Sequence, residues 1–213
     1  MKIGIIGASG KAGSLILKEA VDRGHEVTAI VRNAAKIQDK RVDVVEKNIF
    51  DIKSGDLQKY DVVVNAFGAA PGKEHQHVEA GRVLIEALKG APGTRLVVVG
   101  GAGSLFADES KTVRVMDTPD FPAAFLPTAK SQAQNLEDLQ HSTGIQWTFV
   151  SPAAFFDPAG KRMGSYKTGG DVLALNAEGE SYISYADFAI AILDEIENPQ
   201  HQNERFSVAG EAG

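Results

Sequence analysis

Three glycines near the N-terminus are spaced so that phosphate groups could approach the backbone closely. Gly7, Gly10 and Gly13 follow an apolar run at residues 3–6 and lead into a helical pattern at residues 11–23. Backbone N–H groups at the start of a helix bind phosphate where no side chain blocks the approach, and glycine removes that obstacle. The spacing is G-x-x-G-x-x-G rather than G-x-G-x-x-G, but a dinucleotide-binding loop requires this place between a strand and a helix. We therefore predict a site for the pyrophosphate of a nicotinamide dinucleotide, with a ligand-free tight turn as the alternative.

Residues beside these glycines predict which dinucleotide is bound. Ser9 can add a hydroxyl contact to phosphate, and we place Lys11 and Ala12 in the same site. Arg32 follows a predicted strand at residues 26–31, where an NAD-preferring protein carries an acidic residue that binds the ribose hydroxyls. A guanidinium instead suits a 2′-phosphate through paired hydrogen bonds. We expect NADPH as the cofactor, while NADH stays open because Arg32 could also be an ordinary solvated side chain.

Asp51 and Ile52 are the predicted adenine contacts. Both come shortly after a predicted third strand at residues 44–46. The Asp51 carboxylate can accept a hydrogen bond from the adenine amino group, and Ile52 can pack on the base. As a loop residue, Asp51 could equally cap a turn.

Short apolar strands alternate with amphipathic helices along the whole chain. The predicted strands span residues 3–6, 26–31, 44–46, 61–66, 95–101, 147–150, 181–184 and 205–209, and the helical patterns span residues 11–23, 78–88, 128–141 and 186–197. Apolar strands in such an alternation are buried on both faces, which predicts an α/β fold with a Rossmann-type, doubly wound, mostly parallel sheet. We predict a single NAD(P)-binding domain over residues 1–213, to which residues 152–213 contribute a small C-terminal α+β cap on the substrate side.

The composition excludes several classes of function. The chain has 213 residues, a net charge of −6 and no cysteine. An acidic chain is poorly suited to nucleic acid or to anionic membranes, and the absence of cysteine excludes disulfides and thiolate chemistry. The apolar run after Met1 is too short for a membrane span and lacks a cleavage site. We expect a cytoplasmic protein that binds neither nucleic acid nor membrane, and a homodimer stays open.

Six segments together make the chain similar to the atypical short-chain dehydrogenase/reductases. They are residues 7–13, 31–33, 65–68, 99–104, 147–156 and 183–189. Within that family the chain resembles the NmrA-like and biliverdin/flavin-reductase-like branch, and most of all bacterial proteins named as NADH-flavin reductases. The resemblance implies that Ala66, Phe67 and Gly68 lie beside the central ribose of the dinucleotide.

The resemblance also places the segment after the sixth predicted strand beside the nicotinamide. The residues so placed are Ser151, Pro152, Ala153 and Phe155. These residues and the segment at 66–68 follow strands, and the carboxyl ends of parallel strands are where open sheets bind ligands. Packing in the loop or core is an equal alternative for Pro152 and Phe155.

The active-site residues of typical relatives are only partly present. Those relatives pair a serine after the fifth strand with a Tyr-x-x-x-Lys helix, in which tyrosine protonates the substrate and lysine holds the nicotinamide ribose. Ser104 and Lys130 occupy plausible positions and are the predicted catalytic residues, Ser104 contacting the acceptor and Lys130 orienting the ribose. Leu126 stands four residues before Lys130, so the tyrosine is missing.

The missing tyrosine restricts the reaction. Carbonyl reduction normally needs a positioned proton donor, whereas a flavin or quinone delocalises the added electrons and can take its proton from water. We therefore predict a reductase of a planar small-molecule acceptor, with flavin as a substrate rather than a tightly bound group. Residues 101–127 would then form a wall or lid of the substrate site.

Two other functions remain as alternatives. An NmrA-like regulator would bind the dinucleotide and perform no chemistry. Epimerase or dehydratase chemistry on a nucleotide-sugar ranks lower, because the Tyr-Lys pair is incomplete. His75 and His77 lie near the expected substrate mouth and could donate a proton, although polar residues entering a helix are the simpler interpretation.

Overall fold

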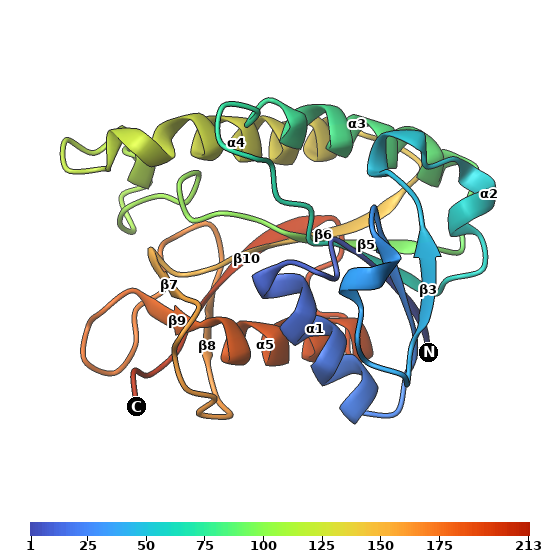
Figure 1. Ribbon diagram of the computed structural model, residues 1–213. Helices are drawn as coiled ribbons and strands as arrows, with labels where there is room; N and C mark the ends of the chain where they lie inside the picture. Colours follow the sequence, from blue (N-terminus) through green and yellow to red (C-terminus); the bar gives the residue numbers. More distant parts are fainter.

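The first strand, β1 (Lys2–Ile6), is buried on both of its faces. Ile3 and Ile5 belong to one hydrophobic core and Ile6 belongs to another. Alternate side chains of a strand point to opposite faces of a sheet, so an uninterrupted apolar run is suited to a strand covered on both sides. The computed structural model describes residues 1–213 and shows this strand inside an α/β sandwich (Figure 1).

Eight strands form one sheet in the spatial order β3-β2-β1-β4-β5-β6-β10-β8. The other members are β2 (Glu26–Val31), β3 (Asp43–Glu46), β4 (Val62–Asn65), β5 (Arg95–Val99), β6 (Gln146–Ser151), β8 (Lys167–Gly169) and β10 (Glu204–Ala209). All neighbours pair in parallel except β8, which runs antiparallel to β10. The order reverses between β1 and β4, and this reversal opens a crevice at the carboxyl ends of the strands.

Helices cover both faces of this sheet. They are α1 (Lys11–Asp22), α2 (Ser54–Leu57), α3 (Gln76–Lys89), α4 (Leu126–His141) and α5 (Tyr185–Glu197), with short 3-10 helices η1 (Ala34–Lys36), η2 (Ile49–Asp51), η3 (Val115–Asp117) and η4 (Ala123–Phe125). Figure 1 shows α3 and α4 side by side above the sheet and α1 with α5 below it. The Rossmann-type doubly wound fold expected from the sequence is confirmed.

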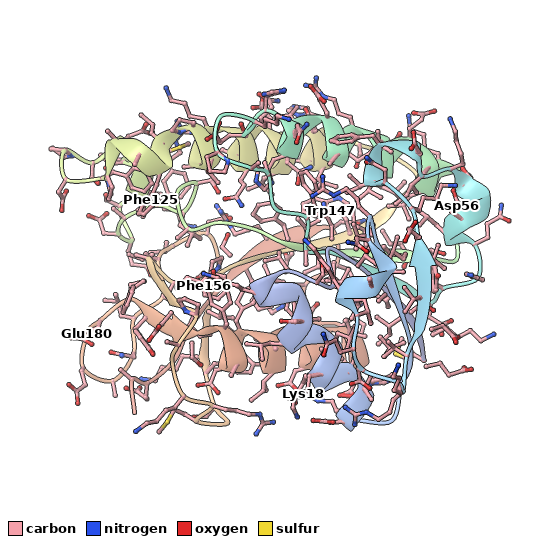
Figure 2. The ribbon with its side chains drawn as sticks, in the orientation of Figure 1. Lys18, Asp56, Phe125, Trp147, Phe156 and Glu180 are labelled. Atoms are coloured by element: carbon pink, nitrogen blue, oxygen red, sulfur yellow. The ribbon has the colours of Figure 1, made fainter.

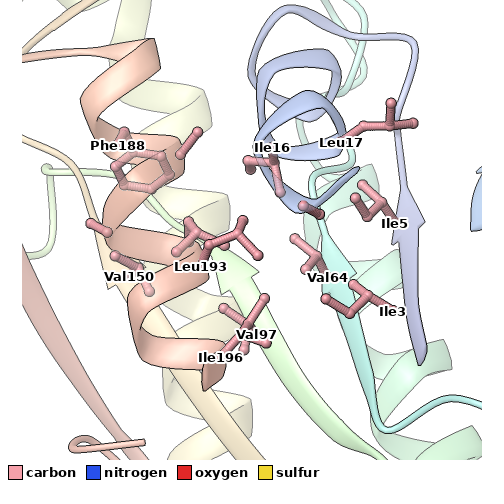
Figure 3. Close-up of a cluster of buried hydrophobic side chains, with 14 of the residues drawn as sticks. Ile3, Ile5, Ile16, Leu17, Val64, Val97, Val150, Phe188, Leu193 and Ile196 are labelled. Atoms are coloured by element: carbon pink, nitrogen blue, oxygen red, sulfur yellow. The ribbon is translucent and has the colours of Figure 1, made fainter. Parts of the chain in front are cut away.

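Each helical layer has its own apolar core. On the lower face, Ile16 of α1 and Leu193 of α5 pack over the strands that carry Ile5 and Val97 (Figure 3). On the upper face, α3 and α4 cover a second cluster that includes Phe149 of β6. Burying one large apolar side chain stabilises a fold by about 1.5–3 kcal/mol, so these two cores hold the helices against both faces of the sheet.

The segment after Pro152 divides between the main sheet and a small separate sheet. Helix α5 packs on α1, and β10 pairs with β6 inside the main sheet. Only β7 (Phe155–Asp157) and β9 (Tyr182–Ser184) form a separate, two-stranded sheet. The physical reason is the apolar composition of α5, whose phenylalanine, isoleucine and leucine side chains need cover that the main sheet and α1 supply. The two strands that the sequence did not predict, β7 and β8, are three residues long and carry little periodic signal.

None of the helices combines the length and the apolar character that crossing a bilayer would take.

Candidate functional site

A cleft of about 660 Å³ follows the carboxyl ends of the central strands. Its walls come from the segments after β1, β2, β4, β5 and β6, from one face of α4 and from the start of α5. Volumes of about 300–1,000 Å³ are typical of small-molecule sites. In Figure 2, Phe125 at the start of α4 and Phe156 near the start of α1 mark the two sides of one end of this cleft.

The glycine loop lines the cleft and requires glycine at two positions. Gly7 has a positive φ of 75°, and a Cβ there would lie closer than 3.0 Å to the carbonyl oxygen of Ala66. A Cβ on Gly13 would lie equally close to the carbonyl oxygen of Gly7. Both obstacles are backbone atoms, which cannot rotate away as a side chain can. The loop is thus a close-packed crossing of β1, β4 and α1, and it leaves the first turn of α1 facing the cleft.

The start of α1 has the donors that an anion needs. The backbone N–H groups of Lys11 and Ala12 have no acceptor within the protein, and Gly10 gives the helix no side-chain cap. The first turn contains no acidic residue that would neutralise the positive end of the helix dipole. Ser9 and Lys11 also line the cleft, and Lys11 makes no ion pair. These residues fit a pyrophosphate.

At one end of the cleft, Arg32 is exposed and forms no ion pair or hydrogen bond within the protein. Lys47 lines the same end but is paired with Asp56 at 2.9 Å. Burial opposes ionisation of Asp56, yet the hydrogen bonds from the Lys47 side chain and the Lys53 N–H, together with nearby positive charge, outweigh it and lower the pKa of that carboxyl. Arg32 is therefore the cation at this end that remains available to a ligand.

The two predicted adenine contacts do not line the cleft. Ile52 is buried in the upper core and borders a separate cavity of about 120 Å³, and Asp51 is exposed at the end of η2. Ile49 lines the cleft instead. The turn of η2 begins where the Asn48 side chain accepts the Phe50 N–H at 3.1 Å. Ile49 and Ile52 both join the upper core, and of the two only Ile49 also borders the cleft.

The segment after β4 lines the cleft with Ala66, Phe67 and Gly68. The side chain of Asn65 accepts the Phe67 N–H at 3.1 Å and so fixes the turn. The ring of His77 meets that of Phe67 edge to face, with centroids 5.6 Å apart, and also lines the cleft. Burial lowers the pKa of His77, so its imidazole is neutral at pH 7.

The segment after β6 is only partly in the cleft. Pro152 and Ala153 line it, whereas Phe155 is 59% exposed and packs against Tyr182 outside it. Phe156 takes the place predicted for Phe155. Successive side chains of a strand point to opposite sides, so in β7 only one of the two phenylalanines can face inward.

Ser104 and Ser151 meet a buried arginine rather than the cleft. Arg205 of β10 donates to Ser104 Oγ at 2.9 Å, to Ser151 Oγ at 3.5 Å and to Asp171 at 3.1 Å. Burial lowers the pKa of this guanidinium despite the bond to Asp171. A buried charge requires such partners, so the two serines satisfy Arg205 and tie the loop after β5 to the sheet. The predicted contact of Ser104 with an acceptor is not part of this geometry.

Lys130 also lies outside the cleft, on an exposed part of α4. The cleft-lining residues of this helix are Thr128, Ala129 and Gln132. Each helical residue turns by about 100°, so Lys130 points about 200° away from Thr128. The predicted contact of Lys130 with the ribose is therefore not part of this geometry, and the polar side chains of α4 that line the cleft are Thr128 and Gln132.

Tyr185 is one of several cleft-lining residues that sequence reasoning missed. It is the first residue of α5 and lines the cleft, and its ring stacks on Phe156 with centroids 3.9 Å apart. Ser184 caps this helix by accepting the Asp187 N–H at 3.0 Å. A strand followed at once by a capped helix was the available signal, because that junction brings the first helical residue to the edge of the site.

Comparisons with known proteins show the family to which the chain belongs. Residues 7–199 match the family model described as NAD(P)H-binding. The chain is 66% identical over 212 residues to the uncharacterised protein YwnB of Bacillus subtilis strain 168, and the match covers 100% of both chains. A provisionally assigned NADH-flavin reductase from Streptococcus pneumoniae TIGR4 is 44% identical, with a TM-score of 0.94 over 99% of this chain and 100% of that one. An anaerobilin reductase from Escherichia coli O157:H7, 20% identical with a TM-score of 0.75 over 98% and 97%, shares the fold.

Proposed function

Because the chain belongs to the NAD(P)H-binding family, we propose that it is a reductase that passes a hydride from a nicotinamide dinucleotide to a planar, conjugated acceptor such as a flavin or quinone. The observation that carries the proposal is one continuous cleft with two different ends. One end joins the glycine loop to Arg32, and the other is walled by aromatic rings. A charged dinucleotide and a flat apolar acceptor need such an arrangement.

The cofactor would occupy the end with the unpaired donors. Its pyrophosphate would accept hydrogen bonds from the N–H groups of Lys11 and Ala12, and Arg32 would bind a 2′-phosphate. Ile49 would pack on the adenine. The turn at Ala66–Gly68 would then support the central part of the cofactor, and Pro152 with Ala153 would lie beside the nicotinamide. This role of Arg32 favours NADPH over NADH.

The acceptor would occupy the aromatic end. Phe121 and Phe125, which precede α4, line one side of this end of the cleft. Phe156 and Tyr185 line the other side. Phe125 is 63% exposed although it is a large apolar side chain. Aromatic rings stack favourably on other flat rings, so these walls suit a planar acceptor that enters as a substrate and leaves again. The similarity to a protein named as a NADH-flavin reductase supports the same class.

The chain's own residues would align the two rings and exclude water. When bound, the dihydronicotinamide supplies a hydride, the acceptor gains two electrons, and the second proton comes from solvent. Flavins and quinones spread the added charge over their rings, so alignment carries more of the catalysis than acid catalysis does. The position of Lys130 outside the cleft is consistent with this division.

An acceptor screen tests the proposal. Oxidation of NADPH and NADH would be followed with FMN, riboflavin and menadione, and dinucleotide affinity would be measured separately by calorimetry. We expect turnover with at least one acceptor and a rate that falls when Gly7→Ala blocks the cofactor. Tight dinucleotide binding with background rates for every acceptor would overturn the proposal and support an NmrA-like sensor.

Two variants with the same change of charge test the preference for NADPH. Arg32→Ala removes the unpaired cation that follows β2 in the cleft, and Lys36→Ala removes an exposed cation that does not line it. We expect Arg32→Ala alone to weaken NADPH, by about tenfold or more, with little effect on NADH. Equal losses for the two cofactors would remove Arg32 from the 2′-phosphate site.

A further inference from the structure

The hydroxyl of Tyr185 differs from those of the other tyrosines in the C-terminal third of the chain. Tyr166 donates to Asp194 at 2.8 Å, and Tyr182 donates to Asp157 at 2.8 Å. The hydroxyl of Tyr185 has no partner within the protein, although the residue is half-buried and lines the cleft. A partly buried tyrosine hydroxyl that has no hydrogen-bond partner within the protein is suited to bind a ligand.

The ring that carries this hydroxyl is held in place. Phe156 stacks on it at an interplanar angle of 33°, and Phe188 supports Phe156 from behind with centroids 4.8 Å apart. Phe188 itself is fully buried in the lower core. The Tyr185 backbone is fixed as the first residue of a capped helix. A hydroxyl on a rigid support loses little conformational freedom when it binds a ligand.

Tyr185 is a hydrogen-bond donor under ordinary conditions. Burial raises the pKa of its phenol, so the proton stays on the oxygen at neutral pH. On the opposite wall, the side chains of Thr128 and Gln132 also make no hydrogen bond within the protein. The aromatic end of the cleft thus offers polar contacts at two edges of a flat, apolar space.

We propose that Tyr185 donates a hydrogen bond to a carbonyl oxygen on the edge of the acceptor ring and thereby selects conjugated carbonyl compounds over other flat heterocycles. The inference rests on the proposed function and narrows its substrate class to rings such as isoalloxazines and quinones. An oxygen in this position becomes more negative as the ring is reduced, so the hydrogen bond strengthens along the reaction.

Binding to the complex of the protein with oxidised cofactor tests the inference. Riboflavin and phenazine are both flat and tricyclic, but only riboflavin carries carbonyl oxygens. Tyr185→Phe keeps the ring that stacks on Phe156 and removes the hydroxyl. We expect this variant to bind riboflavin about three- to tenfold more weakly and phenazine as the wild type does. Tyr166→Phe, which loses a hydroxyl outside the cleft, is the matched control and should leave both affinities unchanged.

The outcomes separate the inference from the function on which it rests. Equal losses for riboflavin and phenazine would mean that Tyr185 acts through packing, and no loss for either would mean that its hydroxyl does not reach the ligand. Either result overturns this inference and leaves the reductase proposal standing if the wild type still reduces acceptors. A wild type that neither binds riboflavin nor reduces menadione would overturn both.

Discussion

The side chain of Gln132 closes directly over the backbone of Gly101. A Cβ on Gly101 would lie closer than 3.0 Å to Gln132 Oε1, at a point where both residues line the cleft. The loop after β5 and the cleft-facing side of α4 are therefore in contact through the Cα of Gly101 and the side-chain amide of Gln132. The amide is the flexible end of its side chain, so a larger residue at Gly101 would move Gln132 rather than the backbone.

This contact predicts how two substitutions combine. Gly101→Ala should displace the Gln132 amide and weaken acceptor binding about as much as Gln132→Ala does. In the double variant the added methyl group has no amide to displace, so the two losses should be less than additive. Acceptor affinity in a double-mutant cycle measures the coupling. Fully additive losses would show that the contact does not transmit the effect.

Gly7 should be intolerant of any side chain. Gly7→Ala combines a positive φ with a collision against the Ala66 carbonyl, so we expect loss of dinucleotide binding and destabilisation above 1 kcal/mol. Gly24→Ala is the matched control, because Gly24 has a φ of 84° and open space around it. Denaturant unfolding of both variants separates the collision from the strained φ. Similar losses of stability in both would contradict the close crossing.

Ser104 should behave as a structural residue. Ser104→Ala removes the hydroxyl that accepts from Arg205 at 2.9 Å, and we expect a loss of about 1–3 kcal/mol in the free energy of unfolding. Turnover should stay within a few fold at a temperature where the variant is folded. A loss of turnover of a hundredfold or more in a fully folded Ser104→Ala variant would restore the catalytic role predicted from sequence.

Lys130 should be dispensable, and Gln132 should not be. Lys130→Ala changes an exposed side chain outside the cleft, so kcat and the KM values for cofactor and acceptor should remain within about twofold. Gln132→Ala, two residues further along the same helix, should raise the KM for the acceptor. Steady-state kinetics of the pair compare two faces of α4 directly. The reverse ranking would show that the ribose is held by Lys130.

The partly buried imidazole of His77 should make the free energy of unfolding depend on pH. Burial holds its pKa in the folded state below the ordinary value of 6.5, so the unfolded chain binds the proton more readily. Stability from this group is therefore complete above about pH 6.5 and is lost as the pH falls through the folded-state pKa, with a slope of up to about 1.4 kcal/mol per pH unit. The free energy of unfolding would be measured for the wild type and His77→Gln between pH 5 and 8. The difference between the two proteins should change only below pH 6.5. Parallel curves would contradict the burial of this imidazole.

The sequence by itself determined the alternation of strands and helices, the parallel sheet and the glycine loop. Each of these depends on interactions between neighbours in the chain: apolar runs suit strands buried on both faces, and glycines at residues 7 and 13 suit a turn into α1. The tertiary structure decided which side chains face the cleft. Thr128 faces the cleft and Lys130 does not because they lie at different angles around α4. Phe156 faces the cleft and Phe155 does not because they project from opposite sides of β7.

Long-range packing decided the rest. Ser104 accepts from Arg205, which lies 101 residues away along the chain, and Tyr185 reaches the cleft because α5 packs on α1. A local sequence pattern cannot predict these two contacts, because they form only when β10 pairs with β6 and the two cores pack. The chain's own residue types thus specified a dinucleotide-binding fold, and its packing specified which of those residues could reach a ligand.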